Sequence, residues 1–350
     1  MASKQVKYNV VLHYYHSPHL NQIYDGFAKL RKLGLCNIQY IPCKEGIGRK
    51  PLLYAEINGV RVLYDCLDGL CWRDDLDYNG NLNYFANHDF NVDYYFKRSY
   101  SPKLESLVNN RFIYQPLGLN YDIWPEYMPI NSTRLKQYFL RTKMGIKWKE
   151  DKLFFKSEEF EQAPIVHPNG RILFLARLWS PDVNDEKLKE ERLRINEMRI
   201  DCIQECRKAF GDLFYGGIQV DYYSLNNCPK ELLMPDKITN RDAYLRLMQA
   251  SNICIATTGL YDSIGWKFGE YVAASRAIVS EPLNYELPGD FTDGKNYYSF
   301  TTPSELVNKI ELLLSDKNVL KKMMDNNKSY YDTNLSPDRL VLNTLDQIQV

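Results

Sequence analysis

The chain has 350 residues, which is long for one domain and fits two α/β domains of about 150–200 residues each. Hydrophobic residues make up 45% of it and charged residues 25%, which is ordinary globular usage and excludes wholesale disorder. The 44 Lys and Arg residues balance the 44 Asp and Glu residues, so no basic excess supports binding to a nucleic acid.

Nothing in the sequence predicts a segment that crosses a membrane. The first apolar run, Val10 to Leu12, is too short for the core of a signal peptide, and no stretch approaches 18 consecutive apolar residues. The eight cysteines include no C-x-x-C pair, which indicates reduced thiols that act as small apolar side chains. We therefore expect a cytoplasmic protein, with peripheral contact to a membrane left open.

The first half alternates strand and helix signals. An opening strand and a helix with apolar residues at helical spacing are expected at Tyr8 to Tyr15 and at Leu20 to Leu33. Asn58-Gly59, between the apolar runs Leu52 to Ile57 and Val60 to Tyr64, is a strong signal for a β-hairpin. Further short strands are expected at Ile38 to Ile41, Asp93 to Phe96 and Phe112 to Tyr114. Such alternation favours a largely parallel sheet covered by helices.

The second half repeats this alternation after a polar, proline-bearing stretch from Gln162 to Gly170. Strands are expected at 172–176, 214–220, 253–256 and 277–279, and helices at 184–210, 242–250 and 266–274. The segment Thr302-Pro303-Ser304-Glu305 predicts the start of another helix, because it combines a hydroxyl cap, a proline in the first turn and a glutamate three positions after the cap.

These elements predict an α/β protein of two Rossmann-like domains that face a cleft. We place the domain boundary at the polar stretch, because domain joints favour exposed segments of this composition. The expected domains are residues 1–165 and residues 166–350. In this arrangement the last helix of the second domain can pack back on the first domain.

One strand end carries most of the chemical information. The predicted strand at 253–256 ends in Thr257, Thr258 and Gly259, and a short loop then leads into the predicted helix at 266–274. Open α/β sheets bind ligands at the carboxyl ends of their strands. A helix N-terminus at such a place presents free N–H groups and a positive partial charge, which suits a diphosphate.

Three residues at the start of this helix strengthen that interpretation. Gly265 would let the backbone approach phosphate oxygens closely, and Lys267 would add a full positive charge. Glu270, one turn further along, can accept two hydrogen bonds from a ribose diol. The alternative is an ordinary strand–loop–helix unit, of which every α/β domain contains several.

The segment Asp262-Ser-Ile-Gly-Trp-Lys-Phe-Gly-Glu270 resembles the donor site of GT-B-fold glycosyltransferases, in the C-terminal domain of the family-1-like members. Many of these enzymes carry two acidic residues eight positions apart, followed by small residues and an apolar strand, and here Tyr271 to Ser280 follow in that way. The resemblance extends backward to 173–178 and 242–252 and forward to 294–298, so it covers about half of the chain. The spore-maturation-protein-like branch is the most similar.

The resemblance implies a nucleotide-diphosphate sugar as co-substrate, bound mainly by the second domain. Arg177 and Lys267 would neutralise the diphosphate and stabilise it as leaving group, and Glu270 would hold the ribose. Asp262 would lie beside the sugar ring, where the family usually has a glutamate; its side chain is one methylene shorter, and both a retaining and an inverting outcome stay open. Such enzymes usually need no metal, and we expect no metal or other cofactor here.

The first domain would serve the acceptor side, and its candidate catalytic groups are less well defined. His13, His16 and His19 lie beside the first strand, and Asp68 follows the hairpin. An inverting enzyme needs a base that takes a proton from the acceptor hydroxyl, and we favour Asp68, with His16 second. A metal site of the three histidines and simple turn chemistry at Asp68-Gly69 are the alternatives.

The sequence thus predicts a metal-independent glycosyltransferase that moves a sugar from a nucleotide-diphosphate sugar to a hydroxyl acceptor, such as a glycan, polysaccharide or other glycoconjugate. Two other functions stay open. One is a catalytically inactive binding or structural protein of polysaccharide or surface assembly, which the Asp262 departure keeps in view. The other is a sugar-nucleotide epimerase, which the absence of histidine after His167 disfavours.

Overall fold

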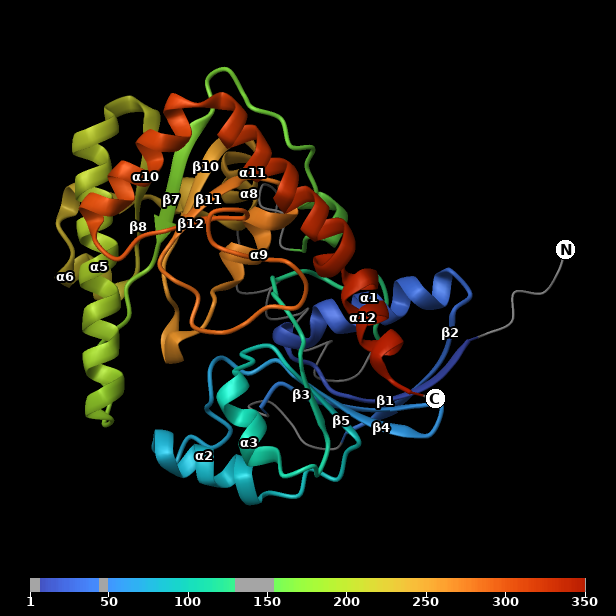
Figure 1. The fold of residues 1–350 in the computed structure, drawn as a ribbon. Coiled ribbons are helices and arrows are strands. Elements are labelled where there is room, and N and C mark those ends of the chain that lie inside the picture. Colours follow the sequence, from blue (N-terminus) through green and yellow to red (C-terminus); the bar gives the residue numbers. More distant parts are fainter. Residues whose placement is uncertain (1–6, 44–49, 130–153, 350) are drawn as a thin grey trace, which may run out of the picture.

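The computed structural model describes residues 7–43, 50–129 and 154–349, and these form two α/β domains, one above the other in Figure 1. The predicted fold class is confirmed, since each domain contains a six-stranded, mostly parallel sheet. No helix in the described ranges is both long and apolar enough to cross a membrane.

The N-terminal sheet has the strand order β2-β1-β3-β4-β5-β6. Its strands are β1 (Tyr8–Tyr14), β2 (Cys36–Pro42), β3 (Leu52–Ile57), β4 (Val60–Asp65), β5 (Tyr94–Lys97) and β6 (Ile113–Pro116). The predicted hairpin is confirmed: β3 pairs antiparallel with β4, and Asn58 and Gly59 both have positive φ, as a two-residue turn of this kind requires. The antiparallel β3 leaves β1, β4 and β5 running in one direction, so their carboxyl ends share one edge.

Helices cover both faces of this sheet. α1 (Asn21–Lys32) packs on one face, and α2 (Tyr78–Asn87) and α3 (Glu105–Val108) on the other. The alternation of β4 explains this, because Val62 and Tyr64 belong to the core beneath α1, whereas Leu63 belongs to the core beneath α2. The sequence signals did not reveal α2, whose start is capped by the Asp77 carboxylate.

The C-terminal sheet is parallel throughout its described strands, in the order β12-β11-β10-β7-β8-β9. They are β7 (Arg171–Ala176), β8 (Phe214–Gln219), β9 (Leu233–Met234), β10 (Ser251–Ala256), β11 (Ala277–Ser280) and β12 (Tyr298–Ser299). The chain builds this sheet outward from β7 in one direction and then outward from β10 in the other. The order therefore reverses between β7 and β10, which is where doubly wound sheets open a crevice for ligands.

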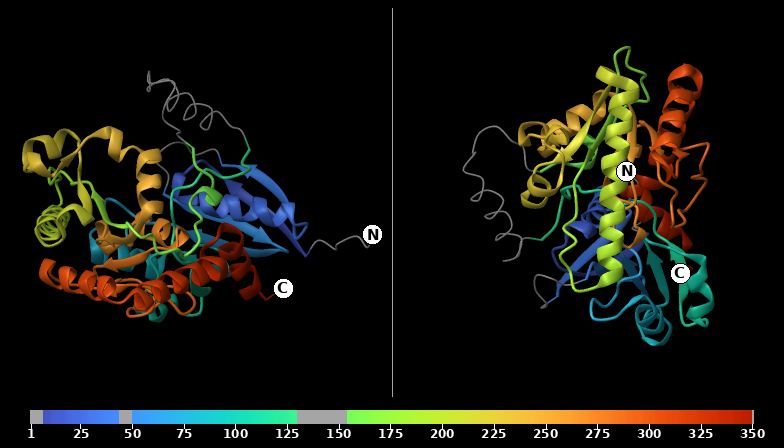
Figure 2. Two further views of the ribbon diagram at one scale, coloured as in Figure 1. Left: turned by 90° about the horizontal axis from the view of Figure 1, so that it is seen from above. Right: turned by 90° about the vertical axis from the view of Figure 1, so that its left-hand side faces the viewer.

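Two layers of helices enclose the C-terminal sheet. The helices of this domain include α5 (Glu186–Phe210), α6 (Tyr222–Asn227), α7 (Asp236–Thr239), α8 (Arg241–Ala250), α9 (Trp266–Ala273), α10 (Pro303–Ser315) and α11 (Lys317–Tyr330). α5 and α10 pack on one face, and α8 and α9 on the other. The long α5 lies along one side of the molecule, as the right-hand view of Figure 2 shows. The start of α10 is as predicted, with the Thr302 side chain accepting a hydrogen bond from the Glu305 N–H.

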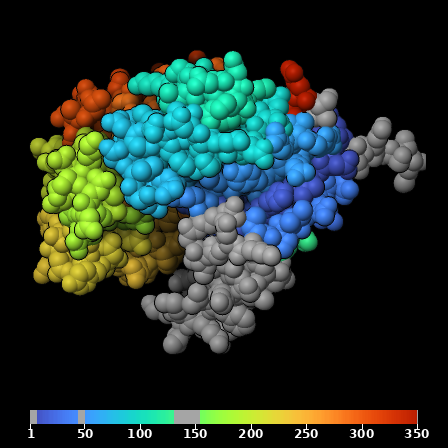
Figure 3. Space-filling model, turned by 90° about the horizontal axis from the view of Figure 1, so that it is seen from below, coloured from blue at the N-terminus to red at the C-terminus, as the bar shows by residue number. Residues whose placement is uncertain are grey.

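The end of the chain returns to the N-terminal domain. After a π-helical turn, Tyr331–Leu335, the last helix α12 (Pro337–Gln347) lies beside α1, and Leu340, Val341 and Leu345 join the N-terminal core. The two helices approach closely at Gly26, where a Cβ atom would lie 2.1 Å from the Pro337 carbonyl oxygen. From below, the blue-to-cyan N-terminal half and the yellow-green-to-gold residues of the other half are seen to meet (Figure 3).

Candidate functional site

A cavity of about 410 Å³ opens between the two domains at the reversal point of the C-terminal sheet. This volume lies in the range of about 300–1,000 Å³ that is typical of small-molecule sites. The carboxyl ends of β7 and β10 and the first turn of α9 form its C-terminal wall, and the loops after β1, β4 and β5 form its N-terminal wall. The residues proposed from the sequence that line it include His19, Asp68, Arg177, Gly259, Gly265, Lys267 and Glu270.

The N-terminus of α9 faces this cavity without a side-chain cap. The N-cap residue is Gly265, which has no side chain that could cap the helix. Gly265, Trp266 and Lys267 all line the cavity. A Cβ atom at Gly265 would have no neighbour within 4 Å, so the space above the first turn is open. The free N–H groups and the positive end of the helix dipole are therefore available to an anion.

Three cations gather around the carboxyl end of β7. Arg177 follows the strand directly, and its guanidinium lies 3.8 Å from the centre of the Trp179 ring. Lys267 Nζ donates to the Leu175 carbonyl oxygen. Arg199, from the middle of α5, donates to the Arg177 carbonyl oxygen at 2.7 Å.

Crowding and burial weaken the charged forms of these cations. Burial, opposed by Glu270 and reinforced by Arg199, Arg241 and Arg177, lowers the pKa of Lys267 to about 8. Burial likewise lowers the pKa of Arg199 to about 10, with Arg177 acting in the same direction. A bound anion would reverse this effect, so the electrostatics of the cavity favour a negatively charged ligand.

Glu270 lies at the back of the cavity, 1% exposed, with its carboxylate already engaged. One oxygen is 2.8 Å from a guanidinium nitrogen of Arg241, and the other accepts a hydrogen bond of 2.8 Å from the Tyr244 hydroxyl. A ribose diol would therefore meet Glu270 as part of this pair with Arg241, which also lines the cavity.

The N-terminal wall brings together Asp68, Arg98 and His19. The Arg98 guanidinium donates to the Asp68 carboxylate and to the Ile264 carbonyl oxygen of the other domain. Burial lowers the pKa of His19, opposed by Asp68 and reinforced by Arg98. His19 Nδ1 is buried and has no hydrogen-bond partner within the described ranges, and its ring lies against Trp266 with 4.6 Å between ring centres. His16, proposed from the sequence, is not among the lining residues, and its ring instead lies near Trp124.

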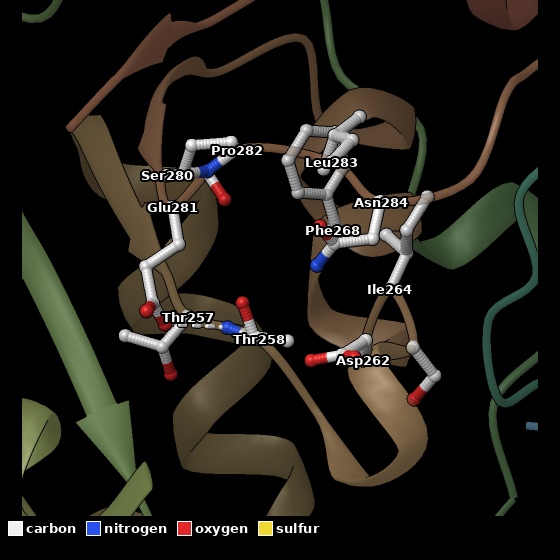
Figure 4. A pocket seen from close by; sticks show the side chains of 12 residues that line it. Thr257, Thr258, Asp262, Ile264, Phe268, Ser280, Glu281, Pro282, Leu283 and Asn284 are labelled. Carbon is white, nitrogen blue, oxygen red and sulfur yellow. Dashed lines mark hydrogen bonds between the residues drawn. The ribbon is translucent and has the colours of Figure 1, made fainter. Parts of the chain in front are cut away.

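Thr258 and Asp262 line a much smaller pocket beside the main cavity (Figure 4). The Thr258 N–H donates to the Glu281 carboxylate at 2.8 Å, a bond that Figure 4 draws as a dashed line. Asp262 has a positive φ of 55°, and its carboxylate lies 3.4 Å from Arg194 of α5. Its carboxylate is thus engaged at the outer rim rather than against the main cavity.

Sequence reasoning missed Arg98, Arg199 and Arg241, although two of them carried a signal. Arg98 is the first residue after β5, a strand parallel to β4, and so belongs to the same sheet edge as Asp68. Arg199 lies on the buried side of α5 among Ile195, Cys202 and Cys206, where an apolar residue is the normal choice. Arg241 gave no comparable signal, since it stands at the first position of a helix.

Gly265→Val tests the site without disturbing the fold. The residue has ordinary φ and ψ values of −66° and 154°, so a side chain is tolerated there, at a cost of about 1 kcal/mol for a poorer N-cap. We expect the affinity for a nucleoside diphosphate to fall at least about tenfold, because the side chain would fill the space where phosphate oxygens meet the helix. Calorimetric titration of wild type, Gly265→Ala and Gly265→Val should show a graded loss, and equal affinities in all three would remove this site.

Within the described ranges, no group of three or more His, Cys, Asp or Glu side chains could hold a metal ion. Of the residues that the structure describes, five cations line the cavity beside two carboxylates, and guanidinium and ammonium groups bind phosphate oxygens directly. The residues present can therefore neutralise a diphosphate through their own charges.

No protein-family description and no curated protein matches the sequence. Among solved structures, the chain is similar to HepE of Anabaena in complex with UDP, at 12% identity over 96% of this chain and 98% of that chain, with a TM-score of 0.42. A glycosyltransferase of Rickettsia africae gives 14% identity over 94% and 93%, with a TM-score of 0.41.

TarM of S. aureus, solved with fondaparinux, α-GlcNAc-glycerol and UDP, gives 11% identity and a TM-score of 0.42. The match covers 81% of this chain and 50% of TarM, so the chain spans about half the length of that protein. The two α/β domains that the sequence predicts are seen in the structure itself. At these identities and TM-scores, activity and substrates do not follow from the likeness.

Proposed function

We propose that this protein transfers a glycosyl unit from a nucleoside diphosphate sugar to a hydroxyl acceptor in the cleft between its domains, without a metal ion. One observation carries the proposal. The uncapped start of α9 and the cations Arg177, Arg199 and Lys267 converge on one cavity at the reversal point of the sheet. We also propose that the protein is cytoplasmic and that its acceptor is a polysaccharide or another glycoconjugate.

The cavity has the charge that such a leaving group needs. As the bond between the anomeric carbon and the diphosphate breaks, negative charge builds up on the phosphate oxygens. Lys267, Arg177 and the first N–H groups of α9 would stabilise this charge, and they are held in place before the substrate arrives. Preorganised groups of this kind need little rearrangement during the reaction.

On the acceptor side, His19 is the best-placed base. Its Nδ1 is buried beside the cavity without a hydrogen-bond partner in the described ranges, and its lowered pKa favours the neutral imidazole. The acceptor oxygen would bond to the anomeric carbon as its proton passes to this nitrogen. Asp68, held by Arg98, would then stabilise the imidazolium that forms. His19 thereby takes the role that the sequence suggested for His16.

His19→Asn and Asp68→Asn separate these roles from donor binding. Each is expected to lower the transfer rate by about 100- to 10,000-fold, the usual contribution of general base catalysis, while nucleoside diphosphate binding stays unchanged. His13→Asn is the matched control, since His13 lies on β1, just before the segment that carries His19, but faces Glu56 outside the cavity. Full activity in His19→Asn would exclude His19 as the proton acceptor, and full activity in Asp68→Asn would exclude Asp68 as the group that stabilises the imidazolium.

The pKa shifts predict a bell-shaped pH dependence of kcat/KM. Burial lowers the pKa of His19 below its usual 6.5, so the neutral base persists to a lower pH than in a free histidine and is lost on the acidic side. The pKa of Lys267 is about 8, so the positive charge facing the diphosphate is lost as the pH rises above that value. Initial rates from pH 5 to 9.5 should show both limbs, and His19→Asn should lose the acidic one. A rate that keeps rising to pH 9.5 would contradict the role of Lys267.

A panel of nucleoside diphosphate sugars tests the activity itself. The protein is incubated with each donor, alone and with mixed hydroxyl acceptors, and the release of nucleoside diphosphate is measured. We expect release from at least one donor, increased by acceptor. Tight binding of the nucleoside diphosphate with no release would favour an inactive binding protein. Recovery of an epimerised donor would favour an epimerase.

A further inference from the structure

Arg199 joins the two strand ends between which the order of the C-terminal sheet reverses. Its Nε donates to the Thr257 hydroxyl at 3.0 Å, and one terminal nitrogen donates to the Arg177 carbonyl oxygen at 2.7 Å. The other terminal nitrogen donates to the Thr258 carbonyl oxygen at 3.3 Å. Arg177 follows β7, and Thr257 and Thr258 follow β10, so one side chain spans the mouth of the crevice.

The charge of Arg199 is buried beside the cavity. The side chain is 9% exposed, and none of the carboxylates in the described ranges forms an ion pair with it. Burial and then Arg177 lower its pKa to about 10, against the opposing effect of the Glu281 charge. Its three hydrogen bonds to neutral oxygens do not require a positive charge. Because an unpaired buried charge is costly, its presence beside the cavity needs a counter-ion supplied by a ligand.

We propose that Arg199 is a positioning residue of the phosphate subsite, which fixes the ends of β7 and β10 and supplies charge behind a bound diphosphate. The inference rests on the proposed function, because it concerns the same cleft. It gives α5 a part in binding the diphosphate, in addition to the parts of the strand ends and of α9. The ligand of this phosphate subsite is a diphosphate, with or without a nucleoside.

Lys267 lies close enough to Arg199 for the two positive charges to repel each other. The groups that face Lys267 are Glu270 of α9, Arg241 and the Tyr244 ring of α8, Arg199 of α5 and Arg177 after β7. A diphosphate would raise the pKa of Lys267, so affinity should fall as the pH rises above the pKa of the free protein, about 8. Removing the charge of Arg199 should move the start of this fall to a higher pH.

The test is titration calorimetry of Arg199→Gln, Arg199→Met and Arg199→Lys with inorganic pyrophosphate and with UDP, from pH 6.5 to 9.5. Comparison with wild type cancels the ionisation of the ligand itself. Arg207→Met is the matched control, because Arg207 also lies on α5 and also donates to two carbonyl oxygens, those of Glu231 and Gly216. Neither Arg207 nor these partners line the cavity.

We expect Arg199→Gln and Arg199→Met to lose at least about tenfold in affinity for pyrophosphate at pH 7.5, and their fall in affinity to begin at higher pH. Arg199→Lys keeps the charge and should keep the pH dependence of wild type. Arg207→Met should lower stability and change neither property. Should Arg199→Met fail to fold, Arg199→Gln decides, because it retains a hydrogen-bond donor.

Affinity and pH dependence equal to wild type in a folded Arg199→Gln would overturn the inference and leave the proposed function standing. An equal loss in Arg207→Met would overturn it too, since the effect would then be one of general stability. Wild type that binds pyrophosphate but transfers no sugar from any donor would end the proposed function and not this inference. Wild type that binds neither pyrophosphate nor UDP would end both.

Discussion

Lys267→Met is expected to lower the rate of sugar transfer by about 100- to 1,000-fold, the loss typical of removing one preorganised group that stabilises transition-state charge. The ammonium group lies at the start of α9 and donates to the end of β7, in the wall of the cavity. Methionine keeps an apolar chain of similar length and removes only the ammonium group, which lies 5.0 Å from the centre of the Tyr244 ring. The fold should therefore survive while the charge is lost.

Initial rates at saturating donor, together with calorimetric affinities, measure this effect. Lys321→Met is the control, because Lys321 pairs with Asp325 on the surface of α11, away from the cavity. We expect the control to keep wild-type rates and affinity. A Lys267→Met protein with wild-type activity would mean that the leaving group is stabilised elsewhere.

Asp65→Ala is expected to lower the free energy of unfolding by about 3–5 kcal/mol, as removal of one partner of a buried ion pair does. Asp65 and Lys97 are both fully buried, with 2.9 Å between carboxylate oxygen and ammonium nitrogen. The same oxygen accepts hydrogen bonds from the Trp72 indole and the Tyr95 hydroxyl. Alanine would leave Lys97 charged and unpaired in the core beneath α2.

The loss of stability in Asp65→Ala should become smaller as the pH rises. Burial already lowers the pKa of Lys97 below its ordinary 10.5, and without Asp65 it would fall further. The unfolded chain then binds more protons than the folded one, so the stability of the variant should rise as the pH approaches 10.5. Urea denaturation at pH 7 and pH 9.5 measures this. A loss below about 1 kcal/mol at pH 7, the size usual for exposed ion pairs in general, would contradict the prediction for this buried pair.

Local sequence patterns were sufficient for most of the fold. Asn58-Gly59 determines a hairpin through its own backbone preferences, and Thr302 to Glu305 start a helix through short-range hydrogen bonds. The apolar runs before Arg177 and Thr257 form buried parallel strands, so the region of the site could be located at their carboxyl ends. Each of these signals depends on residues close together in the chain.

Contacts between distant segments could not be predicted in this way. The choice between His16 and His19 depends on which side of the loop after β1 faces α9, and His19 is the one that meets Trp266. Glu270 is engaged by Arg241 because α8 and α9 lie side by side on the sheet, which neither segment indicates alone. Asp262 is directed to the rim by its positive φ and by Arg194 of α5.

A crystal structure with a bound nucleoside diphosphate tests the central claim most directly. We predict the diphosphate at the first turn of α9, within hydrogen-bond distance of the Trp266 or Lys267 N–H groups and of the side chains of Arg177 and Lys267. A nucleotide bound outside this cavity, or one whose phosphates point away from α9, would contradict the account.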